Sequence, residues 1–334
     1  MHASDFLGGP GYLNSASVGL PPRSAREELA GATERWHKGR IQPPEFDQWV
    51  ERARSSFARI NGVDPATVAI GANVSSFVGL VAGSLPRGAR VVGYRGEFSS
   101  LLFPFMARGD LDVHLVELEE LAGAVDARTA LAVVSAAQSS DGRLAALDDI
   151  AATGARTLVD TTQAAGWLAL DASRFDYTVC AAYKWLLSPR GTAFMTVRPE
   201  RMDELVPAAA GWYAGELPWE SVYGPEMRLA AGARRFDLSP SWLSWVGTAP
   251  ALEYLENTGI EAVRAHDVGL ADALREHLDM PPAGSAIVSV DRPGAAERLA
   301  EAGIVAAVRD GRARVGFHLY NTASDVDAVV AALG

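Results

Sequence analysis

The sequence predicts an α/β protein whose mostly parallel sheet is covered by helices on both faces, followed by a smaller α/β unit. Between residues 66 and 182, short apolar runs alternate with helix-like segments, which is the rhythm of parallel strands joined by crossover helices. The runs lack the polar–apolar alternation of a strand with one face in water, and this indicates burial on both faces. In such sheets ligands bind beyond the carboxyl ends of the strands, so the residues there are candidates for a functional site.

The composition is that of a globular enzyme and argues against several other classes of protein. The chain has 334 residues, of which 49% are hydrophobic and 21% charged, with a formal net charge of −11 and no basic stripe. These values disfavour nucleic-acid binding and wholesale disorder. The single cysteine, Cys180, permits no disulfide within the chain, and the six histidines show no metal-ligand spacing. Because no signal segment or membrane-spanning apolar run is evident, we expect a cytoplasmic protein, and we expect no metal site.

The order of the elements can be predicted along the chain. Two helices, over 23–38 and 44–60, are expected first. The alternating region then predicts strands followed by helices over 67–71 and 75–85, 90–94 and 99–107, 112–116 and 118–125, 130–135 and 147–154, and then strands over 156–160, 177–182 and 192–197. After a tryptophan-rich stretch, the C-terminal unit is expected to comprise a long helix over 244–258, strands over 286–290, 305–308 and 313–317, and helices over 295–302 and 323–333.

The stretch 175–197 carries the first functional signal. It is expected to fold as strand, polar turn and strand, with the turn at 188–191. Lys184 stands at the end of the first of these strands, and Lys38 is the only other lysine in a chain whose remaining basic residues are all arginine. Arginine does not lose its proton in proteins, whereas a buried lysine can become a neutral nucleophile. Lys184 is therefore a candidate nucleophilic amine, and the alternative is a half-buried lysine whose ammonium reaches the surface.

Small and polar residues follow the other predicted strands. The segment 71–77 opens a helix with exposed N–H groups, and Ser75 can add a hydroxyl, which together suit a phosphate group. The alternative is an ordinary helix cap by Asn73 or Ser75. Phe98 follows the next strand, where its ring could stack on a flat heteroaromatic ring or pack in the core. Ser139 belongs to a small polar group after the fourth strand.

A carboxylate at the end of the strand 156–160 is the most specific signal. A buried carboxylate must be paired or hydrogen-bonded, and Asp160 could pair with a protonated ring nitrogen. Gln163 carries an amide that could reach a neighbouring ring oxygen. Asp160, with Lys184 on the next strand, is the combination that a pyridoxal phosphate enzyme needs. The lysine forms a Schiff base, and the carboxylate keeps the pyridinium protonated so that the ring accepts electrons.

With these residues the chain resembles the class V aminotransferase group of fold-type-I pyridoxal phosphate enzymes, which includes cysteine desulfurases, kynureninases and ergothioneine-pathway C–S lyases. The resemblance extends from 12–16 to 320–322. It implies a large domain over 15–245 that binds pyridoxal phosphate and contains a mostly parallel seven-stranded sheet, with a small domain formed by 1–14 and 246–334. It also implies a homodimer with the active site at the subunit interface.

The resemblance implies a role for each matching residue. Lys184 would be the Schiff-base lysine, Asp160 the partner of the pyridinium and Gln163 the contact to the ring oxygen. Further contacts to the cofactor are implied for Phe98, Val74, Ser75, Tyr183, Ser139 and, across the dimer, Ser239. A serine commonly stands three residues before the lysine as a phosphate ligand, but here the position is Ala181. This departure places more of the phosphate's binding on the other contacts.

A second motif, 312–322, is similar to the arginine motif of the family. Arg314 stands where the family binds the α-carboxylate of the substrate, which a planar guanidinium can hold through two parallel bonds. A surface salt bridge is the alternative. Asn14, Ser17 and Trp212 are also expected to contact the substrate. A group of aromatic residues could build a substrate wall, or could equally form a dimer interface or core: Trp212, Tyr213, Trp219, Trp242 and Trp245.

The cofactor would leave several reactions open. Lys184, once released, could act as general base on the α-proton. A cysteine desulfurase is disfavoured, because residues 292–313 contain no cysteine for a mobile loop. We therefore expect a β-eliminating C–S lyase, with an aminotransferase, a kynureninase-like hydrolase and an epimerase as alternatives. A catalytically dead binding or regulatory homologue is the non-enzyme alternative, and the retention of Lys184, Asp160, Gln163 and Arg314 argues against it.

Overall fold

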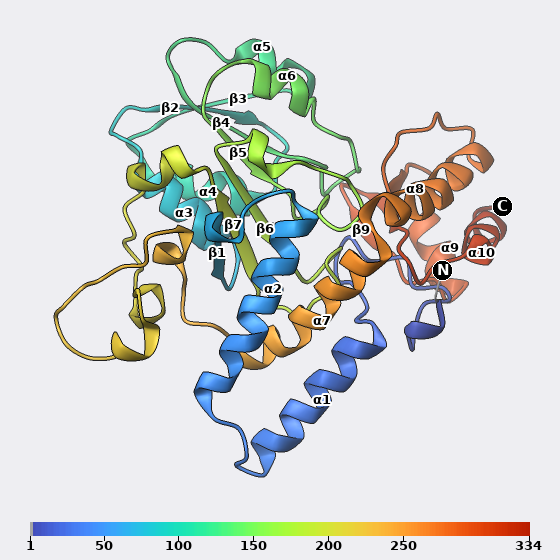
Figure 1. Ribbon diagram of the computed structural model, residues 1–334. Helices are drawn as coiled ribbons and strands as arrows, with labels where there is room; N and C mark the ends of the chain where they lie inside the picture. Colours follow the sequence, from blue (N-terminus) through green and yellow to red (C-terminus); the bar gives the residue numbers. More distant parts are fainter. Residues whose placement is uncertain (1–2) are drawn as a thin grey trace.

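The protein folds around two sheets of different size (Figure 1). The computed structural model describes residues 3–334. A seven-stranded sheet has the order β1-β7-β6-β5-β4-β2-β3, and a three-stranded sheet has the order β8-β10-β9. The strands are β1 (Val68–Gly71), β2 (Arg90–Tyr94), β3 (Asp112–Val116), β4 (Thr129–Ser135), β5 (Thr157–Asp160), β6 (Tyr177–Ala181), β7 (Ala193–Val197), β8 (Ile287–Val290), β9 (Ala307–Arg309) and β10 (Arg312–Gly316).

One strand of the large sheet runs against the others. Strands β2 to β6 pair in parallel, whereas β7 is antiparallel to both of its neighbours, β6 and β1. The reversal has a simple cause, because the loop 182–192 joins β6 to β7 without a crossover helix, and only such a helix would return the chain for parallel pairing. The predicted α/β class with a mostly parallel sheet is confirmed.

Alternate residues of the central strands serve two separate apolar cores. In β6, Cys180 belongs to the core that contains residues of α2 and α7, while Val179 and Ala181 belong to the core that contains residues of α3 and α4. In β7, Phe194 belongs to the first core and Met195 to the second. Every residue of these two strands is buried. Both faces are therefore apolar, which explains why the sequence shows no polar–apolar alternation there.

Helices cover both faces of the large sheet. Helices α1, α2 and α7 pack together on one side, and α3 packs on α4 on the other (Figure 1). The helices are α1 (Arg23–His37), α2 (Asp47–Ile60), α3 (Val74–Ser84), α4 (Ser99–Arg108), α5 (Leu121–Ala124), α6 (Leu147–Ala152), α7 (Trp242–Thr258), α8 (Ile260–His277), α9 (Ala295–Glu301) and α10 (Ala323–Leu333). Across residues 3–334, no helix combines the length and the apolar character that crossing a membrane requires.

The predicted order of elements lacks one long helix, α8. Its buried residues recur at helical spacing, but two of them, Asp267 and Arg275, are ionisable. A pattern interrupted in this way does not show the apolar stripe by which an amphipathic helix is recognised. The other bounds agree to within a few residues, and the predicted strand 305–308 is shifted to Ala307–Arg309.

The N-terminal segment joins the small sheet. Tyr12 bridges to Val305, and Asn14 bridges to Gly316 at the end of β10. Helices α8, α9 and α10 lie at the same end of the molecule as both termini (Figure 1).

The division into two domains stays a prediction. The predicted boundary at residue 245 falls inside α7, which packs on α1 and α2. Residues 1–2 of its small domain lie outside the described part of the chain.

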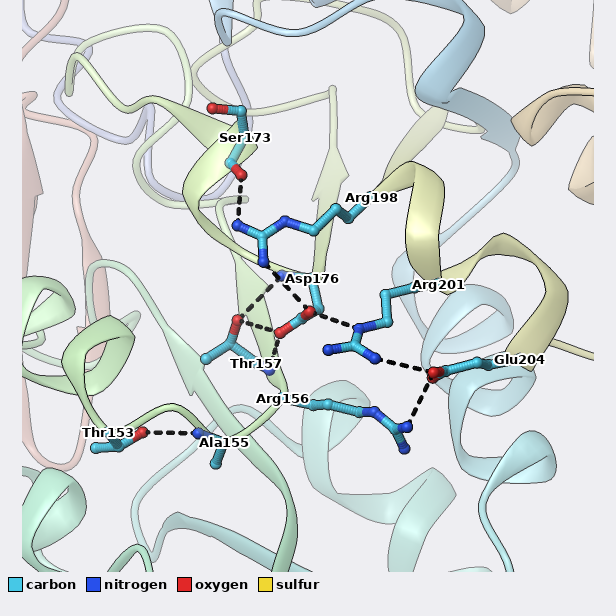
Figure 2. Close-up of polar contacts among 9 residues, drawn as sticks. All are labelled: Thr153, Ala155, Arg156, Thr157, Ser173, Asp176, Arg198, Arg201 and Glu204. Atoms are coloured by element: carbon cyan, nitrogen blue, oxygen red, sulfur yellow. Dashed lines mark hydrogen bonds and ion pairs between the residues drawn. The ribbon is translucent and has the colours of Figure 1, made fainter.

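A polar cluster fixes the amino ends of β5 and β6. Figure 2 shows Asp176, directly before β6, at the centre of this cluster. Its buried carboxylate accepts hydrogen bonds from the backbone N–H of Thr157 at 2.9 Å and from Arg201 Nε at 2.8 Å. Arg198, which follows β7, lies 3.6 Å from the same carboxylate, and Glu204 accepts a bond from Arg201. The cluster ties the first residue of β5 to the start of β6, so it helps to set the register that places their far ends side by side.

Candidate active site

A cavity lies at the carboxyl ends of β4, β5 and β6. Its volume is about 360 Å³, within the range of small-molecule sites. The first turns of α3 and α4 and the loop after β6 contribute its walls. Its lining consists of Ala72, Asn73, Val74, Ser75, Phe98, Ser100, Ser135, Ser139, Asp160, Thr162, Gln163, Ala181, Tyr183, Lys184 and Arg190. The cavity is thus where the strand-end rule predicts a site.

Lys184 lies in the loop beyond the end of β6, not on the strand itself as the sequence analysis expects. The residue is 6% exposed, and its amine lies 5.5 Å from the ring centre of Phe98 and 5.7 Å from that of Tyr183. Burial lowers the pKa of the Lys184 amine to about 8, and the Asp160 carboxylate opposes part of that shift. Part of the amine is therefore uncharged near neutral pH and can act as a nucleophile or a base.

Asp160 is the last residue of β5 and is buried. Its Oδ1 accepts a hydrogen bond from the Thr162 backbone N–H at 2.8 Å. Burial raises the pKa of the Asp160 carboxyl, and hydrogen bonding from Thr162 opposes that rise. Lys184 lines the same cavity, yet no cation of residues 3–334 stands within ion-pair distance of this carboxylate. A ligand that brings its own positively charged N–H group would supply the missing partner.

Hydrogen bonds fix the side-chain amide of Gln163. Its Oε1 accepts a bond from Trp185 Nε1 at 2.8 Å, and its Nε2 donates to Ser139 Oγ at 3.0 Å and to the Ala16 carbonyl oxygen at 2.9 Å. Because an indole N–H can only donate and a carbonyl oxygen can only accept, these contacts determine which way the amide points. Gln163 therefore borders the cavity with a defined orientation.

Helix α3 begins at the wall of the cavity. Asn73 caps it, since the Asn73 side-chain oxygen accepts a bond from the Ser76 backbone N–H at 3.0 Å and from the Ser75 hydroxyl at 2.8 Å. The helix cap that the sequence analysis gives as the alternative to phosphate binding is thus formed. The two are compatible, because a side-chain cap leaves other N–H groups of the first turn unpaired and able to bind an anion. Val74 is buried in the core and also borders the cavity.

Arg314, on β10, is a buried arginine without an acidic partner. It is 1% exposed, and its guanidinium donates to Ser17 Oγ at 2.8 Å and to the carbonyl and hydroxyl oxygens of Ser139. Among residues 3–334 no carboxylate lies within ion-pair range, and its Nε and the nearby Asn14 Oδ1 have no hydrogen-bond partner. Burial lowers the pKa of Arg314 to about 10, and Arg309 adds to the effect. A buried cation in this state favours an anionic ligand.

Comparison with known proteins identifies the family. The family model described as aminotransferase class-V matches residues 107–293. Isopenicillin N epimerase of Streptomyces clavuligerus is 31% identical over 318 aligned residues, covering 84% of this chain and 77% of that protein. The chain belongs to the class-V aminotransferase family. A kynureninase of Salinispora tropica is 27% identical, covering 85% of this chain and 76% of that protein.

Solved structures share the fold over nearly the whole chain. The cystine C–S lyase C-DES, in complex with its product cysteine persulfide, gives a TM-score of 0.87 at 21% identity and covers 98% of each chain. The cysteine desulfurase CsdA of Escherichia coli gives 0.82 at 19% identity, covering 99% of this chain and 96% of that chain. At these identities the likeness shows the fold alone, which is fold type I of the pyridoxal phosphate enzymes, as predicted.

As a member of the class-V aminotransferase family, the protein is a pyridoxal phosphate-dependent enzyme, and its cavity suits that cofactor. Lys184 offers a partly neutral amine for the aldehyde, and Asp160 offers a buried carboxylate that forms no ion pair within residues 3–334. The first turn of α3 offers N–H groups for the phosphate. All three border one cavity. The predicted family and cofactor are thus confirmed, whereas the contacts expected of single residues stay predictions.

Some residues that the class-V resemblance implicates lie away from the cavity of their own chain. Ser239 is exposed and does not border the cavity, and its expected role is across a dimer. Trp212 packs against Tyr213 and Trp219, with ring centres 5.1 and 4.8 Å apart. Trp245 is fully buried in the core. None of the five aromatic residues proposed as a substrate wall lines this cavity.

One charged residue beside the site is missing from the sequence prediction. Glu97 precedes Phe98 and is buried. Its carboxylate accepts bonds from the Ser135 backbone N–H at 2.6 Å and from Gln138 Nε2 at 2.9 Å, so it holds the end of β4 at the cavity. Burial raises the pKa of the Glu97 carboxyl, and the bonds from Ser135 oppose that rise. The reasoning that identifies Asp160, a carboxylate at the end of a buried strand, extends to Glu97, which follows the end of β2 by three residues.

We predict that the apoprotein binds pyridoxal phosphate with a pH dependence set by the buried amine. Only the neutral amine attacks an aldehyde, so the binding rate should rise with pH around a midpoint of about 8, the pKa of Lys184. An unperturbed lysine would give a midpoint of about 10.4. Stopped-flow absorbance over a series of pH values measures this midpoint.

The same measurement on variants tests the role of the carboxylate. Asp160 raises the pKa of Lys184, so Asp160→Asn should move the midpoint to lower pH. Lys38→Ala is the matched control, because Lys38 is the other lysine, is exposed and pairs with Glu34, and it should leave the curve unchanged. A wild-type midpoint near 10 would contradict the burial of the Lys184 amine.

Proposed function

We propose that the enzyme is a β-eliminating lyase that acts on an amino acid carrying a sulfur-linked substituent on its β-carbon. When bound, pyridoxal phosphate supplies an electron sink conjugated with the α-carbon. Lys184 Nζ takes the α-proton, the bond between the β-carbon and sulfur breaks, and its electron pair leaves with the sulfur. The proton held by Lys184 can then pass to the departing thiolate. For a cysteine derivative, hydrolysis of the remaining three-carbon fragment gives pyruvate and ammonia.

One observation carries this choice. Lys184 is a lining amine whose pKa is lowered by burial to about 8, and Asp160 is the candidate partner of the ring nitrogen. A single amine suffices for β-elimination, because it both removes the proton and returns it to the leaving group. Epimerisation needs a second proton carrier on the opposite face, and amino transfer needs a keto acid as a second substrate. β-Elimination therefore makes the fewest demands on these side chains.

The other site residues would position the substrate and the cofactor. Arg314 would bind the α-carboxylate, exchanging some of its present bonds to Ser17 and Ser139 for charged ones. Asp160 would hold a proton on the ring nitrogen, and Gln163 would orient the ring from the side of Ser139. Asp160 and Gln163 line the cavity, whereas Arg314 is buried beside it and bonds to Ser139, which lines it.

Sulfur transfer through a protein persulfide is not supported. Cys180 is the single cysteine, lies on β6 and is fully buried. Burial raises the pKa of its thiol to about 12, so the thiolate that such chemistry needs is not formed near neutral pH. This agrees with the expectation that the chain is not a cysteine desulfurase.

An epimerase is the second candidate. The observation in its favour is the 31% identity to a protein named isopenicillin N epimerase. An epimerase would need a second proton carrier on the face of the substrate opposite Lys184, and Tyr183 of the same cavity or a partner subunit could provide it. The two candidates give different products from the same substrate, so one experiment separates them.

We also propose that the enzyme is a homodimer with two sites at the interface. Phe98, at the mouth of the cavity, is 49% exposed, and Ser239 and Trp212 do not border the cavity of their own chain. A partner subunit could cover Phe98, and it could supply its own Ser239 and Trp212 to the cavity. Sedimentation equilibrium should give twice the monomer mass, and a monomer at assay concentrations would contradict the proposal.

The reaction is tested by incubating the holoenzyme with S-substituted cysteines in D₂O. We expect thiol and pyruvate in equal amounts, no activity in Lys184→Ala, and full activity in Lys38→Ala. Loss of chirality and α-deuterium incorporation without pyruvate would identify an epimerase. Keto acid formation coupled to amination of a second keto acid would identify an aminotransferase. Either of these outcomes would overturn the lyase assignment.

A further inference from the structure

Arg190 carries a second positive charge in the cavity. The sequence analysis assigns it to the turn 188–191 and gives it no functional role. It lies in the loop between β6 and β7 and lines the same cavity as Ser75 and Lys184. Its guanidinium carbon lies 5.2 Å from the ring centre of Tyr183, while the Lys184 amine lies 5.7 Å from that same ring. The Tyr183 ring therefore contacts both cations of the cavity.

Apart from the Tyr183 ring, the Arg190 guanidinium has no partner within the described part of the chain. The residue is exposed, and within residues 3–334 its guanidinium forms no ion pair and donates no hydrogen bond. The loop is held through its backbone instead: Ser244 Oγ donates to the Arg190 carbonyl oxygen at 3.1 Å, and Thr192 Oγ1 donates to the Pro189 carbonyl oxygen at 3.2 Å. The guanidinium is thus free to bind a ligand, and its removal leaves the contacts of the loop in place.

The part of the cavity around α3 is short of charged donors. Ala181 has no hydroxyl, and the hydroxyls of Ser75 and Ser76 both donate to Asn73 Oδ1. The other donors near the start of α3 are also neutral, and they include the N–H groups of its first turn, the Asn73 amide and the Tyr183 hydroxyl. A phosphate monoester carries about −1.5 to −2 charges at pH 7, which neutral donors alone balance poorly. The guanidinium of Arg190 would add the positive charge that these neutral donors lack.

We propose that Arg190 is the cationic anchor of the cofactor's phosphate group, acting together with the first turn of α3 where Ala181 offers no hydroxyl. A guanidinium can make two parallel bonds to phosphate oxygens, and the Tyr183 ring supports it from one face. The inference concerns cofactor binding, so it holds or fails independently of the reaction proposed above.

The test compares two aldehydes that differ only in the phosphate. Apoprotein is titrated with pyridoxal 5′-phosphate and with pyridoxal, and Schiff-base formation is followed by absorbance. Arg190→Gln should weaken binding of the phosphorylated aldehyde by about 10- to 100-fold, the effect of losing charge-assisted bonds. Binding of pyridoxal should be unchanged, which also shows that the variant is folded. Arg190→Lys should recover part of the loss, because it restores the charge without the planar fork.

Inorganic phosphate provides a second readout. It should slow the reaction of pyridoxal phosphate with the wild-type apoprotein and have a much smaller effect on Arg190→Gln. Arg40→Gln is the matched control, since Arg40 is exposed, forms no ion pair within the described chain and does not line the cavity. Equal weakening of both aldehydes by Arg190→Gln, or no weakening of either, would overturn the proposal.

Discussion

The site depends on one physical constraint: an amine and a carboxylate must share a cavity that solvates neither of them well. Burial lowers the pKa of Lys184 and raises that of Asp160, so each loses part of its preference for the charged state. They line the same cavity without forming an ion pair. Two such groups gain most from a ligand that places a positively charged N–H beside the carboxylate and an aldehyde beside the amine. Pyridoxal phosphate has both features.

The loop that carries Lys184 is held from several directions. The Gly19 backbone N–H donates to the Tyr183 carbonyl oxygen at 2.9 Å, and a Cβ at Gly19 would collide with the Lys184 carbonyl oxygen. His318 Nε2 lies 3.0 Å from the Trp185 carbonyl oxygen, and His318 Nδ1 lies 2.9 Å from Asp267 of α8. Segments near both ends of the chain, at Gly19 and His318, therefore contact the loop and hold it in place. Hydrogen bonds run from Trp185 to Gln163, from Gln163 to Ser139 and from Arg314 to Ser139. They connect the loop that carries Lys184 to Arg314, the candidate site for the substrate carboxylate.

The sequence allows the fold and the chemical centre to be predicted, but not the details that depend on loop conformation. Asp160 and Lys184 are recognisable because a buried charge at a strand end has few structural uses. Helix α8 could not be predicted from the sequence, because its buried face includes the ionisable residues Asp267 and Arg275. The position of Arg190 depends on a loop in which Leu187 adopts a positive φ of 57°, a conformation that the residue type does not signal. The position of Trp212, which packs against Tyr213 and Trp219 and not in the cavity, depends on how the loops fold, and this is not visible in the sequence.

A crystal structure of the protein grown with pyridoxal phosphate tests the central claim most directly. Electron density should join the cofactor to Lys184 Nζ. An oxygen of Asp160 should lie within hydrogen-bond distance of the ring nitrogen, because no cation of residues 3–334 forms an ion pair with this buried carboxylate. Density for the cofactor on Lys38, or a ring nitrogen that faces away from Asp160, would contradict it.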